Sequence, residues 1–191
     1  TKHFIDYVRG GGSDKDKDKR RTPLVEPVIT PRFVPSCTEN LLSSLGELAR
    51  STGCRVQSHA VESVDCLATV EMLHGKGPGK GEVDILDRAG LLKEGSIMAH
   101  CVHASKSDVE TFLARGVGIA CCPLSNVYFA GGALRVRALM DANVKIGLGS
   151  DVAGGYSHRM LDAVRHSVTT HLSLCAYGFN VFFECIYVFE F

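Results

Sequence analysis

The sequence lacks several features that would place a protein in a specialised class. Its formal net charge is zero, with 21 basic and 21 acidic residues, so bulk charge indicates neither a nucleic-acid nor a membrane partner. The eight cysteines are scattered and form no CxxC pair, which favours a reducing, cytoplasmic setting over a disulfide framework. No signal-peptide pattern opens the chain, and no HxH motif occurs anywhere in it. The first residue is not Met, so we expect a piece of a longer protein.

Composition divides the 191 residues into three parts. Residues 1–24 contain glycines and a run of alternating charges at 14–21 with no apolar face, which predicts a solvated, disordered linker or foreign segment. Residues 25–174 show regular patterning and are long enough to bury a core. Residues 175–191 are a hydrophobic tail, rich in Phe, Val and Tyr, that we expect to be foreign to the fold and too short to span a membrane.

Within the middle part, short apolar runs alternate with segments of helical periodicity. This alternation predicts right-handed βαβ units and a parallel sheet, because several of the runs are continuously apolar, as strands buried on both faces are. The fold class is therefore α/β. The expected strands are residues 25–33, 54–61, 96–102, 118–122 and 144–149.

Helix boundaries can be predicted from capping patterns. Ser36 with Glu39, and Ser107 with Glu110, have the spacing of capping boxes, and a glycine follows each helix, at positions 53 and 116. Ser157 is the expected cap of a last helix. That helix carries one apolar stripe, made of Leu161, Val164, Val168 and Leu172.

Polar residues follow three of the predicted strands at the point where each ends. His59 and His100 end two strands, and Asp151 follows the last one, just before a glycine pair. Glu62 lies three residues beyond His59, at a strand-to-helix turn. In a parallel barrel all these strand ends meet on one face. A single histidine at such a position is more often a buried core residue than a ligand, but three coincident polar strand ends favour a site.

The residue types suit metal-dependent hydrolysis. Neutral imidazole and carboxylate bind Zn²⁺, which lowers the pKa of a bound water, and a separate carboxylate can carry protons to a leaving amine. The remaining polar residues near these strand ends are interpreted as packing or supporting residues: His103, Cys101, Cys121 and Cys122.

Five short motifs together resemble a known family. They are PRF at 31–33, QSHAVE at 57–62, MAH at 98–100, CPLSN at 122–126 and GLGSDVAGGYS at 147–157. In order and spacing they look like the guanine deaminases of the amidohydrolase superfamily, from about residue 25 to about residue 174.

The resemblance implies a homodimeric, metal-dependent (β/α)₈ barrel that converts guanine to xanthine and ammonia. It further implies that His59 and Asp151 bind Zn²⁺, and that His100 hydrogen-bonds the water on the metal. Glu62 would carry protons between water, ring nitrogen and leaving amine, while Asp151 takes a proton from the attacking water. Arg32 and Phe33 would hold the purine ring.

Two departures limit the resemblance. The family binds its metal first through an HxH motif on the first barrel strand, and the chain has none. The strand after Gly118 carries Cys121 and Leu124 where His and Asn are expected. We therefore expect a partial (β/α)₈ TIM-type barrel, with about the last five βα units and non-matching ends. The alternatives are a related deaminase or triazine-type hydrolase, and a non-catalytic fragment or interaction module.

Overall fold

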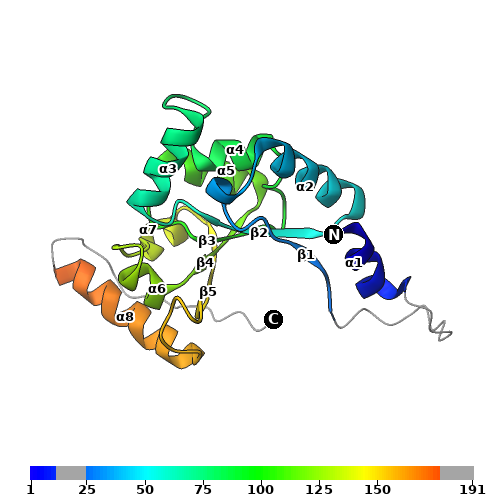
Figure 1. Ribbon diagram of the computed structural model, residues 1–191. Helices are drawn as coiled ribbons and strands as arrows, with labels where there is room; N and C mark the ends of the chain where they lie inside the picture. The colour runs from blue at the N-terminus through cyan, green and yellow to red at the C-terminus, as the bar shows by residue number, and fades with distance from the viewer. Residues whose placement is uncertain (12–24, 177–191) are drawn as a thin grey trace.

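Five parallel strands, arranged in the order of the chain, form the sheet at the centre of the structure (Figure 1). The structure is a computed structural model, and it describes residues 1–11 and 25–176. The helices and strands of these residues are α1 (Lys2–Asp6), the π-helix η1 (Tyr7–Gly11), β1 (Val28–Ile29), the 3₁₀-helix η2 (Val34–Ser36), α2 (Glu39–Thr52), β2 (Arg55–Ala60), α3 (Val64–His74), α4 (Glu82–Arg88), β3 (Ile97–His100), α5 (Lys106–Arg115), β4 (Gly118–Cys121), α6 (Pro123–Tyr128), α7 (Val136–Asp141), β5 (Lys145–Leu148) and α8 (Met160–Ala176).

The register of the sheet brings the carboxyl ends of its strands together. Ala60, the last residue of β2, pairs with His100, the last residue of β3, and Cys121 at the end of β4 pairs with Leu148 at the end of β5. At least one helix separates each strand from the next. The predicted α/β class, with parallel strands in sequence order, is confirmed.

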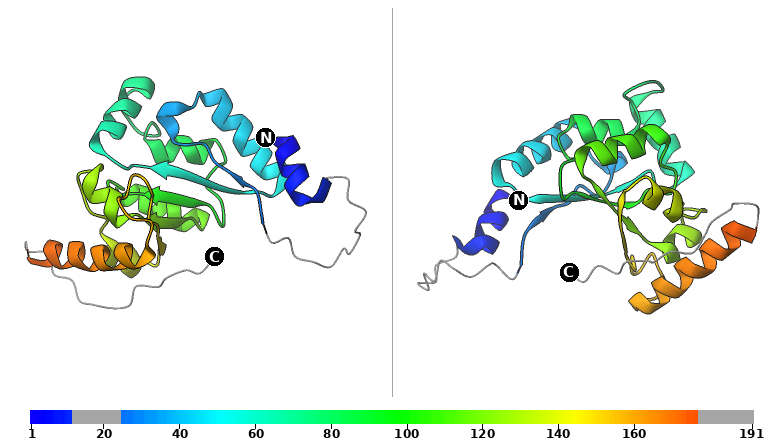
Figure 2. Two further views of the ribbon diagram at one scale, coloured as in Figure 1. Left: turned by 60° about the horizontal axis from the view of Figure 1, so that its bottom comes forward. Right: turned by 180° about the vertical axis from the view of Figure 1, so that it is seen from behind.

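Helices cover the sheet and enclose its core. Two views show α2, α3, α4 and α5 gathered on one side of the strands, while α6 and α8 lie near β5 (Figure 2). The core between these layers contains large side chains from helices, strands and connections, each at most 2% exposed: Leu86, Leu91, Met98, Phe112 and Ile119. Burying a side chain of this size contributes about 1.5–3 kcal/mol, so this core supports the strand ends.

All five predicted strands are present, but the first is shorter than expected. Residues 25–33 contain only the two-residue strand β1, and the rest of this segment has no regular secondary structure before η2 begins at Val34. Pro27 and Pro31 interrupt the segment, and a proline cannot donate a backbone hydrogen bond to a neighbouring strand.

The two predicted capping boxes were each placed two residues from the observed cap. Thr38, not Ser36, caps α2, and its hydroxyl accepts from the Leu41 N–H. Ser105 caps α5 and forms a capping box with Asp108. Nearby serines and threonines offer similar local patterns, and only the extended backbone at the true cap distinguishes them. The predicted glycines do end both helices, with φ of 69° at position 53 and 68° at position 116.

Helix α8 differs from expectation in which side chains it buries. Leu161 and Leu172, two members of the predicted apolar stripe, are 65% and 47% exposed, whereas Ala163 is fully buried. Ser157 does not cap the first turn directly. Its hydroxyl accepts from the Arg159 N–H and donates to the Asp162 carboxylate. The helix packs on α6 and β5 through a narrower face than the sequence indicated.

The amino-terminal residues are helical where the sequence predicted a linker over 1–24. Ile5 in α1 is 2% exposed, and the Arg9 guanidinium bonds to Glu26 at 3.2 Å and to the carbonyl of Thr52. The charged run at 14–21 and residues 177–191 of the predicted tail lie outside the described residues. In the part of the chain that is described, no helix is both long and apolar enough to cross a membrane.

The close contact of Gly46 in α2 with the residue that follows α4 predicts a steric effect. A β-carbon at Gly46 would overlap the backbone carbonyl oxygen of Ala89. Ala is favoured over Gly in helices by up to about 1 kcal/mol. A rigid backbone contact outweighs this, because overpacking costs about 1–3 kcal/mol. We expect Gly46→Ala to lower the urea midpoint of unfolding, while Ser44→Ala, on the exposed face of the same helix, leaves it nearly unchanged. An unchanged midpoint for Gly46→Ala would mean that α2 does not pack this closely.

Candidate active site

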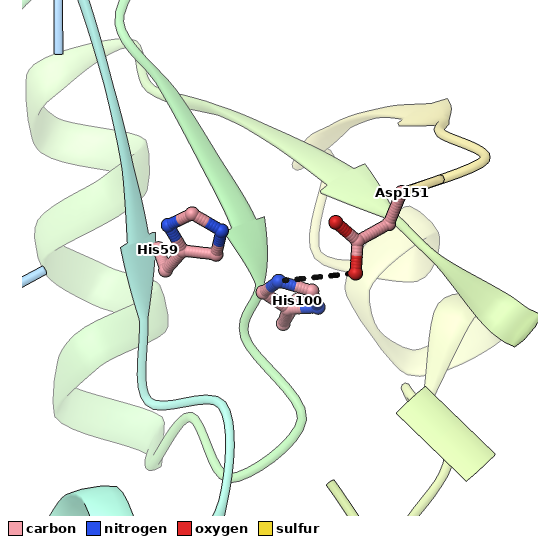
Figure 3. A group of neighbouring side chains, drawn as sticks. All are labelled: His59, His100 and Asp151. Carbon is pink, nitrogen blue, oxygen red and sulfur yellow. Dashed lines mark ion pairs between the residues drawn. The ribbon is translucent and has the colours of Figure 1, made fainter. Parts of the chain in front are cut away.

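Three of the predicted site residues meet at the carboxyl end of the sheet. His59 is the fifth residue of β2, His100 ends β3, and Asp151 lies three residues beyond β5. One ligand atom from each of the three residues lies within 4.8 Å of the others, a separation that a single metal ion can bridge (Figure 3). The expected convergence of these side chains is therefore present in the structure.

The His59 ring is held by the backbone of the segment next to β2. Its Nδ1 lies 2.6 Å from the carbonyl oxygen of Arg32, which also accepts the His59 backbone N–H at 2.9 Å. A carbonyl can only accept, so Nδ1 carries the proton. The Nε2 lone pair is then available to a metal, which is how metal-binding histidines are usually oriented.

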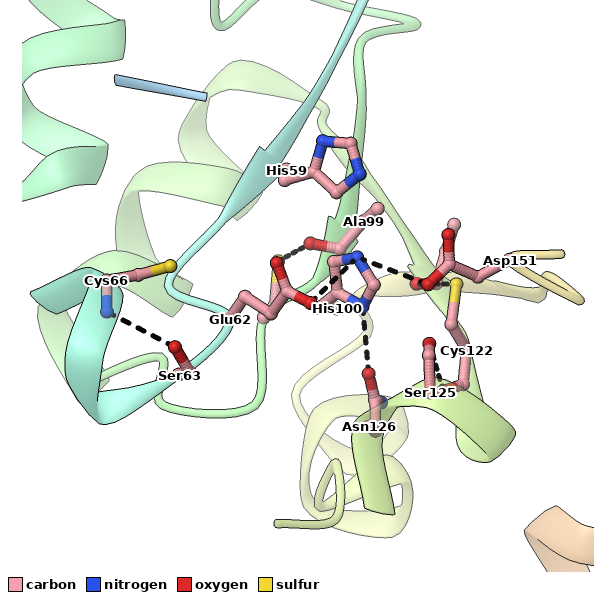
Figure 4. A network of polar contacts seen from close by, with 12 residues as sticks. His59, Glu62, Ser63, Cys66, Ala99, His100, Cys122, Ser125, Asn126 and Asp151 are labelled. Atoms are coloured by element: carbon pink, nitrogen blue, oxygen red, sulfur yellow. Dashed lines mark hydrogen bonds and ion pairs between the residues drawn. The ribbon is translucent and has the colours of Figure 1, made fainter. Parts of the chain in front are cut away.

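The His100 ring is oriented in the same way by a different partner. It is 1% exposed, and its Nδ1 lies 2.9 Å from Asn126 Oδ1 (Figure 4). Its Nε2 is buried and has no hydrogen-bond partner among the described residues, and it lies 4.0 Å from Asp151 Oδ2. The ring stacks on His59 with centroids 5.1 Å apart. A buried nitrogen without a partner is costly, so this atom fits a site that receives a metal or a polar ligand.

Glu62 joins this group from the turn after β2. Its carboxylate lies 3.6 Å from His100 Nε2, and its side chain is 24% exposed. The backbone of Val61 just before it adopts φ of 44°, a conformation that β-branched residues rarely take. The turn thereby directs Glu62 back toward the strand ends, where a carboxylate can exchange protons with a bound substrate.

The loop after β5 fixes Asp151 closely. The backbone of Asp151 has φ of 48°, and its carbonyl accepts the Gly155 N–H at 2.5 Å. A β-carbon at Gly154 would come within 2.7 Å of Asp151 Oδ2. Gly154 is therefore required because the loop backbone passes directly beside the carboxylate, and Gly155 is required because a β-carbon there would overlap the carbonyl oxygen of Ser150.

Arg32 contacts the site through its backbone, and Phe33 lies next to it in the chain. The Arg32 carbonyl binds His59, as described above, whereas its side chain is exposed and its guanidinium lies 5.8 Å from the centre of the Phe33 ring. Among the described residues the guanidinium has no hydrogen bond or ion pair.

The buried cysteines near the strand ends remain protonated thiols. Burial raises the pKa of Cys121 and of Cys122 to about 12, and burial also raises the pKa of Cys101. A thiol with such a pKa is neither a thiolate ligand nor a nucleophile at neutral pH. The predicted packing role of these cysteines agrees with their raised pKa values.

The side chain of His103 has a buried Nε2 with no partner in the described part of the chain.

Sequence reasoning assigned no role to two residues that support the site. Asn126, at the buried end of α6, orients His100, although the CPLSN motif that contains it was recognised. Glu82, the first residue of α4, is 2% exposed and accepts backbone N–H groups from Val34 and Val61. No local pattern marks Glu82, because glutamates are rarely buried.

Comparison with known proteins gives consistent matches over most of the chain. The Amidohydrolase family profile matches residues 10–183. Guanine deaminase of Dictyostelium discoideum is 38% identical over 169 residues, which cover 88% of this chain and 35% of the relative. Mouse guanine deaminase is 41% identical over 150 residues, which cover 78% of this chain and 33% of the relative. The chain thus spans about a third of the length of these curated relatives.

A solved structure agrees with the sequence matches. The crystal structure of guanine deaminase from C. acetobutylicum, with guanine bound in its active site, superimposes with a TM-score of 0.77 at 32% identity. The match covers 84% of this chain and 38% of that one. The expected barrel fold is confirmed for the part of the barrel that the chain contains.

The geometry predicts how metal affinity will respond to mutation. We expect His59→Ala and Asp151→Asn to abolish Zn²⁺ binding by the chain in isothermal titration calorimetry. Gly154→Ala should weaken binding by about tenfold, because its β-carbon displaces the Asp151 carboxylate without removing a ligand. Tyr156→Phe, at an exposed position of the same loop, serves as the control and should bind like the wild type. Wild-type affinity in Asp151→Asn would show that Asp151 does not bind the metal, and wild-type affinity in Gly154→Ala would show that Gly154 does not constrain the Asp151 carboxylate.

Proposed function

The chain belongs to the amidohydrolase family, and on that premise we propose that it carries part of the active site of a zinc-dependent guanine deaminase. The observation that carries the proposal is the arrangement of His59 and His100. Each ring has Nδ1 bound to an oxygen and Nε2 left for the site, with the Asp151 carboxylate within 4.8 Å. The names of the similar proteins, at 38% and 41% identity, support guanine as the substrate.

We propose that Zn²⁺ is the metal and that His59 and Asp151 are its ligands in this chain. An imidazole nitrogen from His59 and a carboxylate oxygen from Asp151 are donor types that zinc prefers. A catalytic zinc site needs at least one further protein ligand. When bound, the ion would lower the pKa of a water toward neutrality and so provide the nucleophile.

The remaining chemistry is proton transfer by residues of this chain. Water adds its oxygen to the ring carbon that bears the amino group, and Asp151 accepts one of the water protons. Glu62 takes the other water proton and delivers it to the adjacent ring nitrogen. The proton held by Asp151 then passes by way of Glu62 to the amine, which leaves as ammonia when the carbon–nitrogen bond breaks and the carbonyl of xanthine forms. The two water protons thus end on xanthine and on ammonia. His100 would hydrogen-bond the attacking water.

Arg32 and Phe33 are the proposed contacts to the purine. The guanidinium provides a planar set of donors that suits a carbonyl-bearing heterocycle. The Phe33 ring lies beside it and provides an apolar surface for a flat ligand. Because the Arg32 carbonyl also holds His59, substrate and metal would be oriented by the same short segment.

The cellular setting follows from the same proposal. The described residues contain free cysteines at positions such as 37, 54 and 66, which fits a reducing cytoplasm. The family resemblance implies a homodimer of the complete protein. Guanine is the proposed partner, and we propose none of nucleic-acid or membrane type.

The first test concerns the chain by itself. Because it has no HxH motif, we expect the purified 191-residue chain to release no xanthine from guanine above background. Joining it to the HxH-bearing amino-terminal part of a guanine deaminase relative should restore turnover. The control is the same joined protein with both HxH histidines replaced by alanine. Xanthine release by the isolated chain at an enzymatic rate would contradict the proposed division of the metal site.

The second test separates proton transfer from metal binding. In the joined protein, Glu62→Gln should lower kcat by about a hundredfold or more while zinc content stays near that of the wild type, because a proton carrier is lost and no ligand is. His59→Ala is the matched control and should lose zinc and activity together. Loss of zinc from Glu62→Gln would mean that Glu62 is a ligand.

A further inference from the structure

Glu82 connects two segments of the site without touching any of the proposed ligands. It is the first residue of α4 and only 2% exposed. Its two carboxylate oxygens have different partners. Oε1 accepts the backbone N–H of Val34 at 3.3 Å, and Oε2 accepts the backbone N–H of Val61 at 2.7 Å. The two donors are 27 residues apart in the chain, and this side chain links their segments beyond the point where β1 pairs with β2 and the Arg32 carbonyl binds His59.

The first donor fixes the segment that is proposed to hold the purine. Val34 follows Arg32 and Phe33 directly and is fully buried. On the other side of Phe33, the Arg32 carbonyl is bound by the backbone and ring of His59. The segment is therefore held at both ends, by β2 through Arg32 and by Glu82 through Val34.

The second donor fixes the turn that carries Glu62. Val61 has the unfavourable φ of 44°, and both of its backbone polar groups are engaged. Its N–H donates to Glu82, and its carbonyl accepts the His103 N–H at 3.0 Å. Unusual backbone conformations persist when their surroundings hold them from several sides, and here Glu82 supplies one of those contacts.

The cost of burying Glu82 argues that this connection is specific. Burial raises the pKa of its carboxyl group, and the two backbone hydrogen bonds act in the opposite direction. A buried carboxylate is costly unless hydrogen bonds compensate it. An apolar residue at this position would fill the space but would leave two buried N–H groups without an acceptor.

We propose that Glu82 is a positioning residue that couples the Arg32–Phe33 segment to the Glu62 turn, so that purine binding and proton transfer are set by one buried side chain. This rests on the proposed function for the roles of the two segments. The coupling itself concerns only backbone contacts, and it can be tested separately.

The first experiment measures the coupling in the 191-residue chain by hydrogen–deuterium exchange. Glu82→Met, which is close in volume and has no acceptor, should speed exchange by about tenfold or more in peptides that cover 33–36 and 61–64. Glu82→Gln keeps one acceptor and should have a smaller effect. Asp84→Ala is the matched control, because Asp84 is the exposed carboxylate of the same helix turn and binds Gly81 instead.

The exchange data distinguish a positioning role from a general stabilising one. Peptides from β3 and β4 should exchange at wild-type rates in the Glu82 variants. Faster exchange across the whole sheet would mean that Glu82 only stabilises the fold. Faster exchange in just one of the two segments, or in neither, would overturn the coupling.

The second experiment uses the joined, active protein described above. We expect Glu82→Met to raise KM for guanine by about tenfold and to lower kcat by a similar factor, with zinc content unchanged. A smaller fraction of folded enzyme would lower kcat alone, so an unchanged KM would contradict the proposal. If the wild-type joined protein does not deaminate guanine, the proposed function fails, and the exchange experiment alone decides whether Glu82 couples the two segments.

Discussion

The site depends first on the hydrogen bond between His59 Nδ1 and the Arg32 carbonyl, which is 2.6 Å long. This bond sets the tautomer of the imidazole and leaves Nε2 for a metal. It also holds the segment after β1 against the end of β2, since the same carbonyl accepts the His59 backbone N–H. Neither effect needs a charged partner, so the ring can be oriented before any ligand arrives.

A second oxygen performs the same task for His100. Asn126 lies in α6, directly after β4, and so the strand next to His100 delivers its partner. The two stacked rings are thus oriented by different parts of the fold, the segment after β1 and helix α6. Each ring is held by the chain that follows a neighbouring strand, β1 for His59 and β4 for His100. The parallel order of the strands therefore places the site residues on one face and also places the groups that orient them.

Much of the fold and part of the site could be predicted from the sequence, for a physical reason. The strands are continuous apolar runs, and residues such as His59 and Asp151 end or follow them, so periodicity and the convergence of parallel strand ends suffice. Helix caps were misplaced by two residues, at Thr38 and Ser105, because the cap is decided by backbone conformation among several equivalent hydroxyls.

The roles of Asn126 and Glu82 could not be predicted, because each depends on contacts between segments distant in the chain. Glu82 lies 48 residues from Val34 and 21 from Val61, and nothing in its neighbourhood distinguishes it from an exposed helix-start glutamate. The exposure of Leu161 and Leu172 on α8 has a similar origin. An apolar stripe predicts which side chains of a helix would gain from burial. The neighbouring helices and strands determine which of these side chains are buried.

Backbone conformation at the strand ends explains why such distant supports are needed. Val61, His100, Cys101 and Asp151 all have positive φ, and all lie where the polar residues converge. Each such residue costs on the order of 1–3 kcal/mol and persists only when surrounding bonds hold it. The Cys101 N–H bonds to the Ala99 carbonyl at 3.0 Å, which closes a tight turn around His100, as Glu82 and His103 do around Val61. The polar side chains can point into one small volume because their backbones turn sharply. The turns exist because buried acceptors and donors stabilise them. The shape of the site is therefore determined by supporting residues such as Glu82, which do not themselves perform the chemistry.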